Sequence, residues 1–488
     1  MTESCDLGAV EARRLIGERD LSPVELLDSC IARIEAVNPA VNAVVATCYE
    51  RARAEARAAE RAVMTGDDLP PLHGLPVGIK DVNETEGLTT TWGCAVFRDH
   101  VPARDDNIVA AVRRAGGIVV AKTNTPEFAA GANTVNGLYG ATVNPFDTRL
   151  TCGGSSGGSG VALATGMLPL AQGSDIGGSL RLPAAYTGVV GMRSSPGLVP
   201  YEDRPLAFTT LDIQGPMART VEDAALLLSV LAAGPGADPM AYPHDAAALR
   251  DLPAVDLARL RVAFSDDLGV APVGRAVRRT FRERVGRFGS AFAACADGQP
   301  DLAGAIDVFW LLRGQYMLAR FRDLMDRHGL ALGANPHGNY QAALVMPVKD
   351  MAVAHAEQMR LFQALERFFA EVDILICPAS TVPPFPVEQN WPTEIDGAPM
   401  ANYMHWGAMT STLSVTGHPV VVLPCGRDAE GTPFGLQIVG PIHRDRFLLG
   451  VAHALERLFQ RDPMLARPVP DLDRLRRAGR GDRPARLA

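Results

Sequence analysis

Two clusters of glycine and serine decide how this sequence folds: Gly153-Gly154-Ser155-Ser156-Gly157-Gly158-Ser159-Gly160 and Gly173-Ser174-Asp175-Ile176-Gly177-Gly178-Ser179-Leu180-Arg181. Both lie in the segment 131–197, in which fifteen of 67 residues are glycine. Such a composition is also typical of a flexible linker. The apolar runs 161–164 and 167–170 are embedded in it, however, and they favour a backbone held close to other groups over a free chain.

Several kinds of site compete as explanations of these clusters. A nucleotide-binding P-loop needs a lysine directly after its last glycine, and neither cluster has one. The pattern G-x-S-x-G of a nucleophile elbow matches around Ser155 and Ser156, but residues 146–152 do not form the buried strand that should precede it. Taken alone, each cluster also fits a tight glycine turn packed under a helix.

Short apolar runs on both sides of the clusters predict buried strands, and helical patterns alternate with them. The strand 75–80 would end at Lys80, and the others are expected at 118–121, 372–378, 420–424 and 435–440. A capping box with proline at the first helical position, Ser22-Pro23-Val24-Glu25, predicts a helix start. This alternation indicates an α/β fold.

The strands lie on both sides of the glycine-rich segment with no linker between them. The sequence therefore predicts one large domain over 1–466, although length alone would allow about three. Residues 300–370 are expected to form a variable, mostly helical region on the substrate side. Residues 467–488 are rich in arginine and poor in apolar residues, so we expect a loose tail.

Composition excludes several classes of protein. The net charge of −8 argues against nucleic acid as a partner. There is no signal-peptide pattern and no apolar run of about 18 residues, so we expect a cytoplasmic protein without a membrane span. The eight cysteines are scattered and are expected to be reduced. The ten histidines form no metal-binding pattern, and we expect neither metal nor cofactor.

Lysine is rare in this chain. Of 47 basic residues only Lys80, Lys122 and Lys349 are lysines. Unlike arginine, lysine can lose its proton in a protein. We expect Lys122 to be a plain charge at a strand end and Lys349 to lie on the surface.

The two clusters, together with Gly74-Leu75-Pro76-Val77-Gly78-Ile79-Lys80-Asp81, resemble the amidase signature family. The resemblance runs from the N-terminal helices through residues 215–220 to the last strands. It implies a mixed central β-sheet covered on both faces by helices. It also implies an enzyme that hydrolyses carbon–nitrogen bonds of small amides with water, without a cofactor; whether it forms a homodimer stays open.

The resemblance assigns a role to individual residues. Ser179 would be the nucleophile, Ser155 a bridging serine that follows a cis peptide bond at Gly154, and Lys80 the base. A lysine can accept a proton only if its pKa falls well below about 10.4, and burial behind an apolar strand lowers it. Ser156 would either bond the lysine or cap the turn.

The second cluster would also bind the oxygen of the reacting carbonyl group. Its backbone N–H groups can converge on one oxygen, and glycine lets the chain approach the substrate closely. The expected donors are Ile176, Gly177, Gly178 and Ser179. Asp175 and Arg181 flank this turn, and we interpret them as a structural ion pair.

Substrate preference is less well marked. Phe128, Ala129, Ala130 and Gly131 are expected near the nucleophile, and the aromatic-rich stretch 305–345 with Trp391, Tyr403, His405 and Trp406 would form the outer wall. An apolar wall with few charges would suit aryl, fatty or cyclic amides, and also carbamates or esters. The sequence is similar in this general way to aryl acylamidases and to hydrolases of nylon-type cyclic oligoamides.

Two other functions stay open. A glutaminase subunit of a glutamyl-tRNA(Gln) amidotransferase usually carries Lys-Pro-Thr-Tyr-Gly after the nucleophile, whereas this chain has Met192-Arg193-Ser194-Ser195-Pro196-Gly197. A non-catalytic binding protein on the same fold would not need Lys80, Ser155 and Ser179 together.

Overall fold

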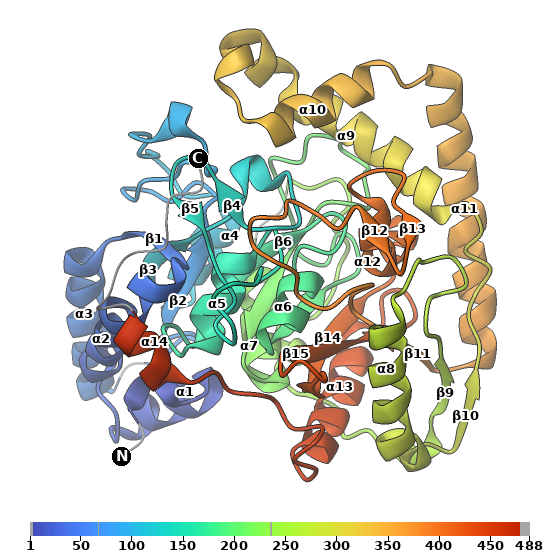
Figure 1. Cartoon of the computed structure of the whole chain (residues 1–488). Helices are drawn as coiled ribbons and strands as arrows, with labels where there is room; N and C mark the ends of the chain where they lie inside the picture. Colours follow the sequence, from blue (N-terminus) through green and yellow to red (C-terminus); the bar gives the residue numbers. More distant parts are fainter. Residues whose placement is uncertain (1–2, 67, 235–236, 479–488) are drawn as a thin grey trace.

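One large β-sheet collects strands from almost the whole chain (Figure 1). The computed structural model describes residues 3–66, 68–234 and 237–478. The eleven strands lie in the order β1-β3-β2-β6-β8-β7-β14-β15-β11-β9-β10. Their bounds are β1 Val44–Thr47, β2 Pro76–Lys80, β3 Ile118–Thr123, β6 Leu170–Asp175, β7 Val190–Arg193, β8 Ile213–Ala218, β9 Arg261–Phe264, β10 Ala294–Asp297, β11 Ile374–Pro378, β14 Val420–Arg427 and β15 Pro433–Val439. All five strands expected from the sequence are present.

The sheet is mixed, as predicted. Strand β2 runs parallel to both of its neighbours, β3 and β6, and β9 runs parallel to β10 and β11. The remaining pairs, including β6 with β8 and β14 with β15, are antiparallel. The parallel pairing of β2 with β6 is the decisive one for function, because it brings the end of β2 beside the second glycine cluster.

Helices cover both faces of this sheet, as alternation along single strands shows. On β8, Met217 belongs to a buried cluster with side chains of α5 and α6, whereas Ala218 belongs to a cluster with side chains of α7. The helices are α1 Ala9–Glu18, α2 Pro23–Val41, α3 Tyr49–Thr65, α4 Asn107–Arg114, α5 Gly157–Ala164, α6 Arg181–Thr187, α7 Val221–Leu231, α8 Arg275–Phe288, α9 Ala305–His328, α10 Ala334–Leu344, α11 Val348–Glu371, α12 Ala408–Thr416, α13 Asp445–Phe459 and α14 Leu472–Ala478. Successive strand side chains point to opposite sides, and both sets are buried because helices cover both faces.

The region 300–370 is mostly helical, as expected. Helices α9, α10 and α11 form a layer beside the sheet, coloured yellow to orange in Figure 1. Helix α9 packs against α12, which carries part of the wall of the candidate site. Two further pairs of short strands, β4 Val135–Asn136 with β5 Gly140–Ala141 and β12 Glu394–Ile395 with β13 Ala398–Pro399, lie outside the main sheet.

The two chain ends give one confirmation and one correction. Helix α2 begins as predicted, because the Ser22 hydroxyl accepts a hydrogen bond from the backbone N–H of Val24 at 3.0 Å. The tail is not loose throughout: residues 472–478 form α14, whose Leu475 is fully buried against α2. Leu475 thus anchors this arginine-rich segment to the rest of the molecule. Residues 479–488 of the expected tail lie outside the described residues. Within the described ranges, none of the helices is long and apolar enough to cross a membrane.

Candidate active site

Lys80 is the last residue of β2 and is fully buried. Its Nζ lies 2.6 Å from Ser155 Oγ and 2.9 Å from Ser174 Oγ, and it donates to both hydroxyls. Burial lowers the pKa of Lys80 to about 7, although the carboxylates of Asp175 and Asp212 act in the opposite direction. The side chain therefore loses its proton at a lower pH than a lysine in water, as a lysine base would require.

Ser155 comes from the first glycine cluster, and its peptide bond with Gly154 is cis, as expected. The cluster is packed so closely that a Cβ on Gly154 would lie 2.9 Å from the backbone carbon of Ala132. Ser156 fits neither expected role. Its hydroxyl contacts the backbone N–H and C=O of Ser174, each at 3.3 Å, and so ties the cluster to β6 instead of bonding the lysine or capping α5.

Ser174 is a further site residue that the sequence did not indicate. It lies in β6, directly before Asp175, and supplies the second hydroxyl that contacts Lys80. The signal was its position in the second cluster, but only the parallel pairing of β2 with β6 brings it to the lysine.

Ser179 lies half-buried in the turn between β6 and α6. Its carbonyl accepts a hydrogen bond from the N–H of Ser156 at 3.2 Å, which fixes the two clusters against each other. The preceding Gly178 has φ +130°, and a Cβ there would lie 2.2 Å from Thr410 Oγ1. Only glycine fits this position.

The expected group of four N–H donors is reduced by one. The N–H of Gly178 donates to Asp175 Oδ1 at 2.9 Å and is therefore already occupied. Among the described residues, the N–H groups of Ile176, Gly177 and Ser179 have no hydrogen-bond partner. These three remain available to an oxygen in the pocket.

Asp175 and Arg181 form the expected ion pair, at 3.0 Å and with both side chains fully buried. Arg193 joins them: its Nη1 lies 3.2 Å from Asp175 Oδ1 and donates to the Asp175 carbonyl at 2.7 Å. Burial alone would raise the pKa of Asp175, but the two arginines outweigh it and hold the pKa well below its usual range. These three side chains tie β6, α6 and β7 together.

Lys122 is not a plain strand-end charge. It is fully buried, and its Nζ contacts the Asn83 carbonyl and lies 3.1 Å from each of the hydroxyls of Thr85 and Thr90. Asp81 Oδ1 lies 4.0 Å away. Burial lowers the pKa of Lys122 to about 8. Lys349, in contrast, is exposed as predicted.

A pocket joins the two clusters to the helical region. Ser155, Ser174 and Ser179 line it together, and α9 adds Arg313 and Met317 to its wall. The other lining residues are Ala129, Gly131, Ala132, Gly154, Ile176, Gly177, Gly178, Leu182, Tyr403, Met404, Trp406, Gly407 and Thr410.

The predicted substrate-side residues are only partly in place. Ala129 and Gly131 line the pocket, and so do Tyr403 and Trp406. Phe128 and Ala130 do not: the Phe128 ring packs 5.7 Å from that of Phe321, and Ala130 is fully buried. The backbone φ of +50° at Phe128 turns this side chain into an aromatic cluster. Arg313 adds one charged side chain to a wall that was expected to hold few charges.

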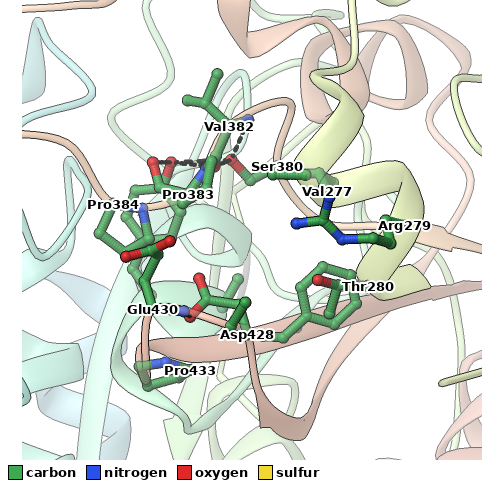
Figure 2. Close-up of a pocket in the computed structure, with 16 residues that line it drawn as sticks. Val277, Arg279, Thr280, Ser380, Val382, Pro383, Pro384, Asp428, Glu430 and Pro433 are labelled. Carbon is green, nitrogen blue, oxygen red and sulfur yellow. Dashed lines mark hydrogen bonds between the residues drawn. The ribbon is translucent and has the colours of Figure 1, made fainter. Parts of the chain in front are cut away.

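Figure 2 shows a second pocket between α6, α8, the start of β15 and the loops 380–384 and 428–430. Its carboxylate Asp428 is engaged in its own turn, where it accepts hydrogen bonds from Glu430 and Thr432. Ser155, Ser174 and Ser179 line the first pocket and none of them lines this one, so the first pocket is the candidate active site.

The comparisons with known proteins agree with this site. The family model described as Amidase matches residues 25–291 and 334–449, and the chain belongs to this family, the amidase signature family. It is accordingly an enzyme that hydrolyses amide carbon–nitrogen bonds. The chain is 31% identical to an acylamidase of Rhodococcus erythropolis, over 92% of this chain and 95% of the relative.

Other relatives show how widely the fold is used. The chain is 33% identical to a glutamyl-tRNA(Gln) amidotransferase subunit of Roseiflexus castenholzii, over 94% of this chain and 97% of that protein. A bacterial aryl acylamidase superposes with a TM-score of 0.86 at 26% identity, covering 98% and 99% of the two chains. A 6-aminohexanoate cyclic dimer hydrolase superposes with a TM-score of 0.81 at 26% identity, covering 97% and 98%.

Proposed function

We propose that this enzyme hydrolyses small amides with a largely apolar or aryl body through an acyl-enzyme on Ser179. The observation that carries the proposal is the contact of the fully buried Lys80 with Ser155, at 2.6 Å between Nζ and Oγ. Ser155 in turn lines the same pocket as Ser179. A serine hydroxyl is a weak nucleophile until a base accepts its proton. A buried lysine with a pKa near 7 can act as that base at neutral pH.

The proton passes through Ser155. Neutral Lys80 takes the proton of the Ser155 hydroxyl while Ser155 takes that of Ser179, and Ser179 Oγ forms a bond to the carbonyl carbon. The carbon–nitrogen bond then breaks as the proton returns along the same path to the leaving amine. Water attacks the acyl-enzyme by the same route and releases the carboxylic acid and free Ser179.

The turn before α6 stabilises the negative charge on the substrate oxygen. Ile176, Gly177 and Ser179 supply the N–H donors, and the buried pair of Asp175 with Arg181 holds the turn in place. Removal of one such donor typically lowers the rate about 10²–10³-fold. Ser156 contributes by fixing the first cluster to β6.

The apolar part of the wall sets the preference for the substrate body. Leu182, Met317, Met404 and Trp406 provide it, and carbamates or esters can undergo the same acyl-transfer chemistry. Residues 1–466 act as one catalytic domain, in which the region 300–370 contributes the substrate side through α9.

The test is a turnover panel of anilides, aliphatic primary amides, cyclic oligoamides, aryl carbamates and glutamine, combined with labelling by a fluorophosphonate. Ser179→Ala should remove both turnover and labelling. Ser290→Ala, at an exposed position, is the matched control and should leave both unchanged. Wild-type protein that hydrolyses no amide and is not labelled would instead indicate a non-catalytic binding protein.

A glutaminase subunit of an amidotransferase is the second candidate, because glutamyl-tRNA(Gln) amidotransferase subunits are 31–33% identical to this chain. The segment 192–197 argues against it, because it lacks the Lys-Pro-Thr-Tyr-Gly run that is usual in such subunits. Glutaminase activity that rises with a co-purified partner protein would favour this function over a stand-alone amidase.

A further inference from the structure

Arg313 is a buried cation in the wall of the candidate active site. It lies on α9, its residue is 5% exposed, and it lines the same pocket as Ser155 and Ser179. Its α9 neighbour Met317 and the loop residue Met404 make the adjoining wall apolar. A charge in such a place is costly unless a group of opposite charge balances it.

The protein partners of Arg313 are neutral. Its Nη1 donates to Asn339 Oδ1 and its Nη2 to the hydroxyl of Tyr403, whose own O–H donates to Asn339 at 2.8 Å. The guanidinium also lies over the Tyr403 ring, 5.1 Å from its centre. Across residues 3–66, 68–234 and 237–478, no carboxylate lies within ion-pair distance of it, and only two of its five N–H groups have partners.

Other buried arginines show how this chain normally treats such a charge. Arg33, Arg181 and Arg193 each form an ion pair with an aspartate. Arg219 and Arg284 donate to backbone carbonyls, and neither lines the candidate site. Arg313 therefore differs in combining a buried, carboxylate-free guanidinium with a position in the pocket wall.

We propose that Arg313 binds a carboxylate of the substrate, so that the enzyme prefers amides that carry one carboxylate away from the scissile bond. This inference rests on the proposed amide hydrolysis and narrows its substrate class to amphipathic amides with an apolar or aryl body. The planar guanidinium matches a carboxylate with two parallel hydrogen bonds. Asn339 and Tyr403 hold the group in orientation through the two N–H groups that they occupy.

The test compares matched substrates in which only the charge changes. One pair places the carboxylate on the acyl side, N-phenylglutaramate against N-phenylglutaramide. The other places it on the amine side, 4-acetamidobenzoate against 4-acetamidobenzamide. We expect a preference of about 10- to 100-fold in kcat/KM for the charged member of one pair, the size of a charge-assisted contact.

Arg313→Met should reduce that preference to within about threefold, while Arg313→Lys should retain part of it. Arg322→Met is the matched control, because Arg322 lies on the same helix with 72% of its side chain exposed. The control should keep the full preference. A wild-type ratio near one for both pairs, or a ratio that survives Arg313→Met, would overturn the proposal.

Binding separates this proposal from that of amide hydrolysis. In a Ser179→Ala background, calorimetry should show tighter binding of the preferred carboxylate than of its neutral partner, and the added Arg313→Met change should remove the difference. If wild-type protein hydrolyses none of the four amides and no member of the turnover panel, and is not labelled, but this binding difference holds, the hydrolytic proposal fails and the carboxylate site stands. Equal binding of both members of each pair refutes the carboxylate site.

Discussion

Replacing Lys80 by methionine should abolish amide hydrolysis and yet make the folded protein more stable below pH 7. Lys80 is fully buried, and burial lowers its pKa from 10.5 to about 7. A difference of that size corresponds to a cost of about 5 kcal/mol for holding the charge in the folded state. The hydrogen bonds to Ser155 and Ser174 are lost in the variant, at about 1 kcal/mol each, so we expect a net gain of about 2–4 kcal/mol.

The effect must depend on pH with a definite sign. Below pH 7 the lysine is protonated in both states, so the full cost falls on the folded protein. Between pH 7 and about 10.5 the unfolded chain holds a proton that the folded chain lacks, and wild-type stability therefore rises with pH. The difference between Lys80→Met and wild type should be largest at pH 6 and should shrink steadily towards pH 10.

Urea unfolding followed by circular dichroism at pH 6 and pH 9.5 measures this difference. Lys349→Met is the matched control, because it removes an exposed lysine and should change stability little at either pH. A Lys80→Met protein that is less stable than wild type at pH 6 would refute the reasoning. So would a stability difference of the same size at both pH values.

Three further predictions concern activity. The kcat/KM of the wild type should rise with pH to a plateau, with a midpoint near pH 7. Lys80→Arg should lower kcat/KM at least about 10²-fold, because its guanidinium keeps its proton. Substantial turnover by this variant would exclude lysine as the base. Ser174→Ala removes a hydrogen-bond acceptor that favours the charged form of Lys80, so the midpoint of the kcat/KM profile should move to lower pH. A midpoint unchanged from wild type would mean that this contact has no effect on the pKa of Lys80. Gly178→Ala should lose activity and fluorophosphonate labelling together, because a Cβ would lie 2.2 Å from Thr410 Oγ1; the same change at the open Gly137 is the control.

Local sequence patterns predicted the parts of the fold that depend on neighbouring residues. The apolar run before Lys80 predicted a buried strand, and the two clusters placed Ser155 and Ser179 in tight turns. The sequence did not predict Ser174 as a site residue, because its contact with Lys80 arises from the pairing of two strands about ninety residues apart. No periodicity within either segment fixes that pairing.

The substrate side was predicted least well, for a different physical reason. Phe128 was expected in the cleft on the basis of its place in the chain, but the backbone has a positive φ at both Phe128 and Ala129, and the Phe128 side chain packs into an aromatic cluster instead. Arg313 lies in a helix of mixed composition, where an arginine ordinarily faces solvent. Only the packing of α9 against α12 shows that this arginine faces the pocket.

The scarcity of lysine has a different meaning once the two buried lysines are compared. In the parallel register, Lys80 pairs with Thr123 and Lys122 pairs with Ile79, so the two lysines leave adjacent strands on opposite faces of the sheet. On one face the partners are hydroxyls that can exchange a proton, and on the other Lys122 meets a carbonyl, two threonines and Asp81. The first environment suits a base and the second a fixed cation. Arginine can serve at nearly all the other basic positions of this chain. Each of these two strand ends, in contrast, holds a compact ammonium group in a fully buried site. At Lys80 that group must also be able to lose its proton, which arginine cannot do.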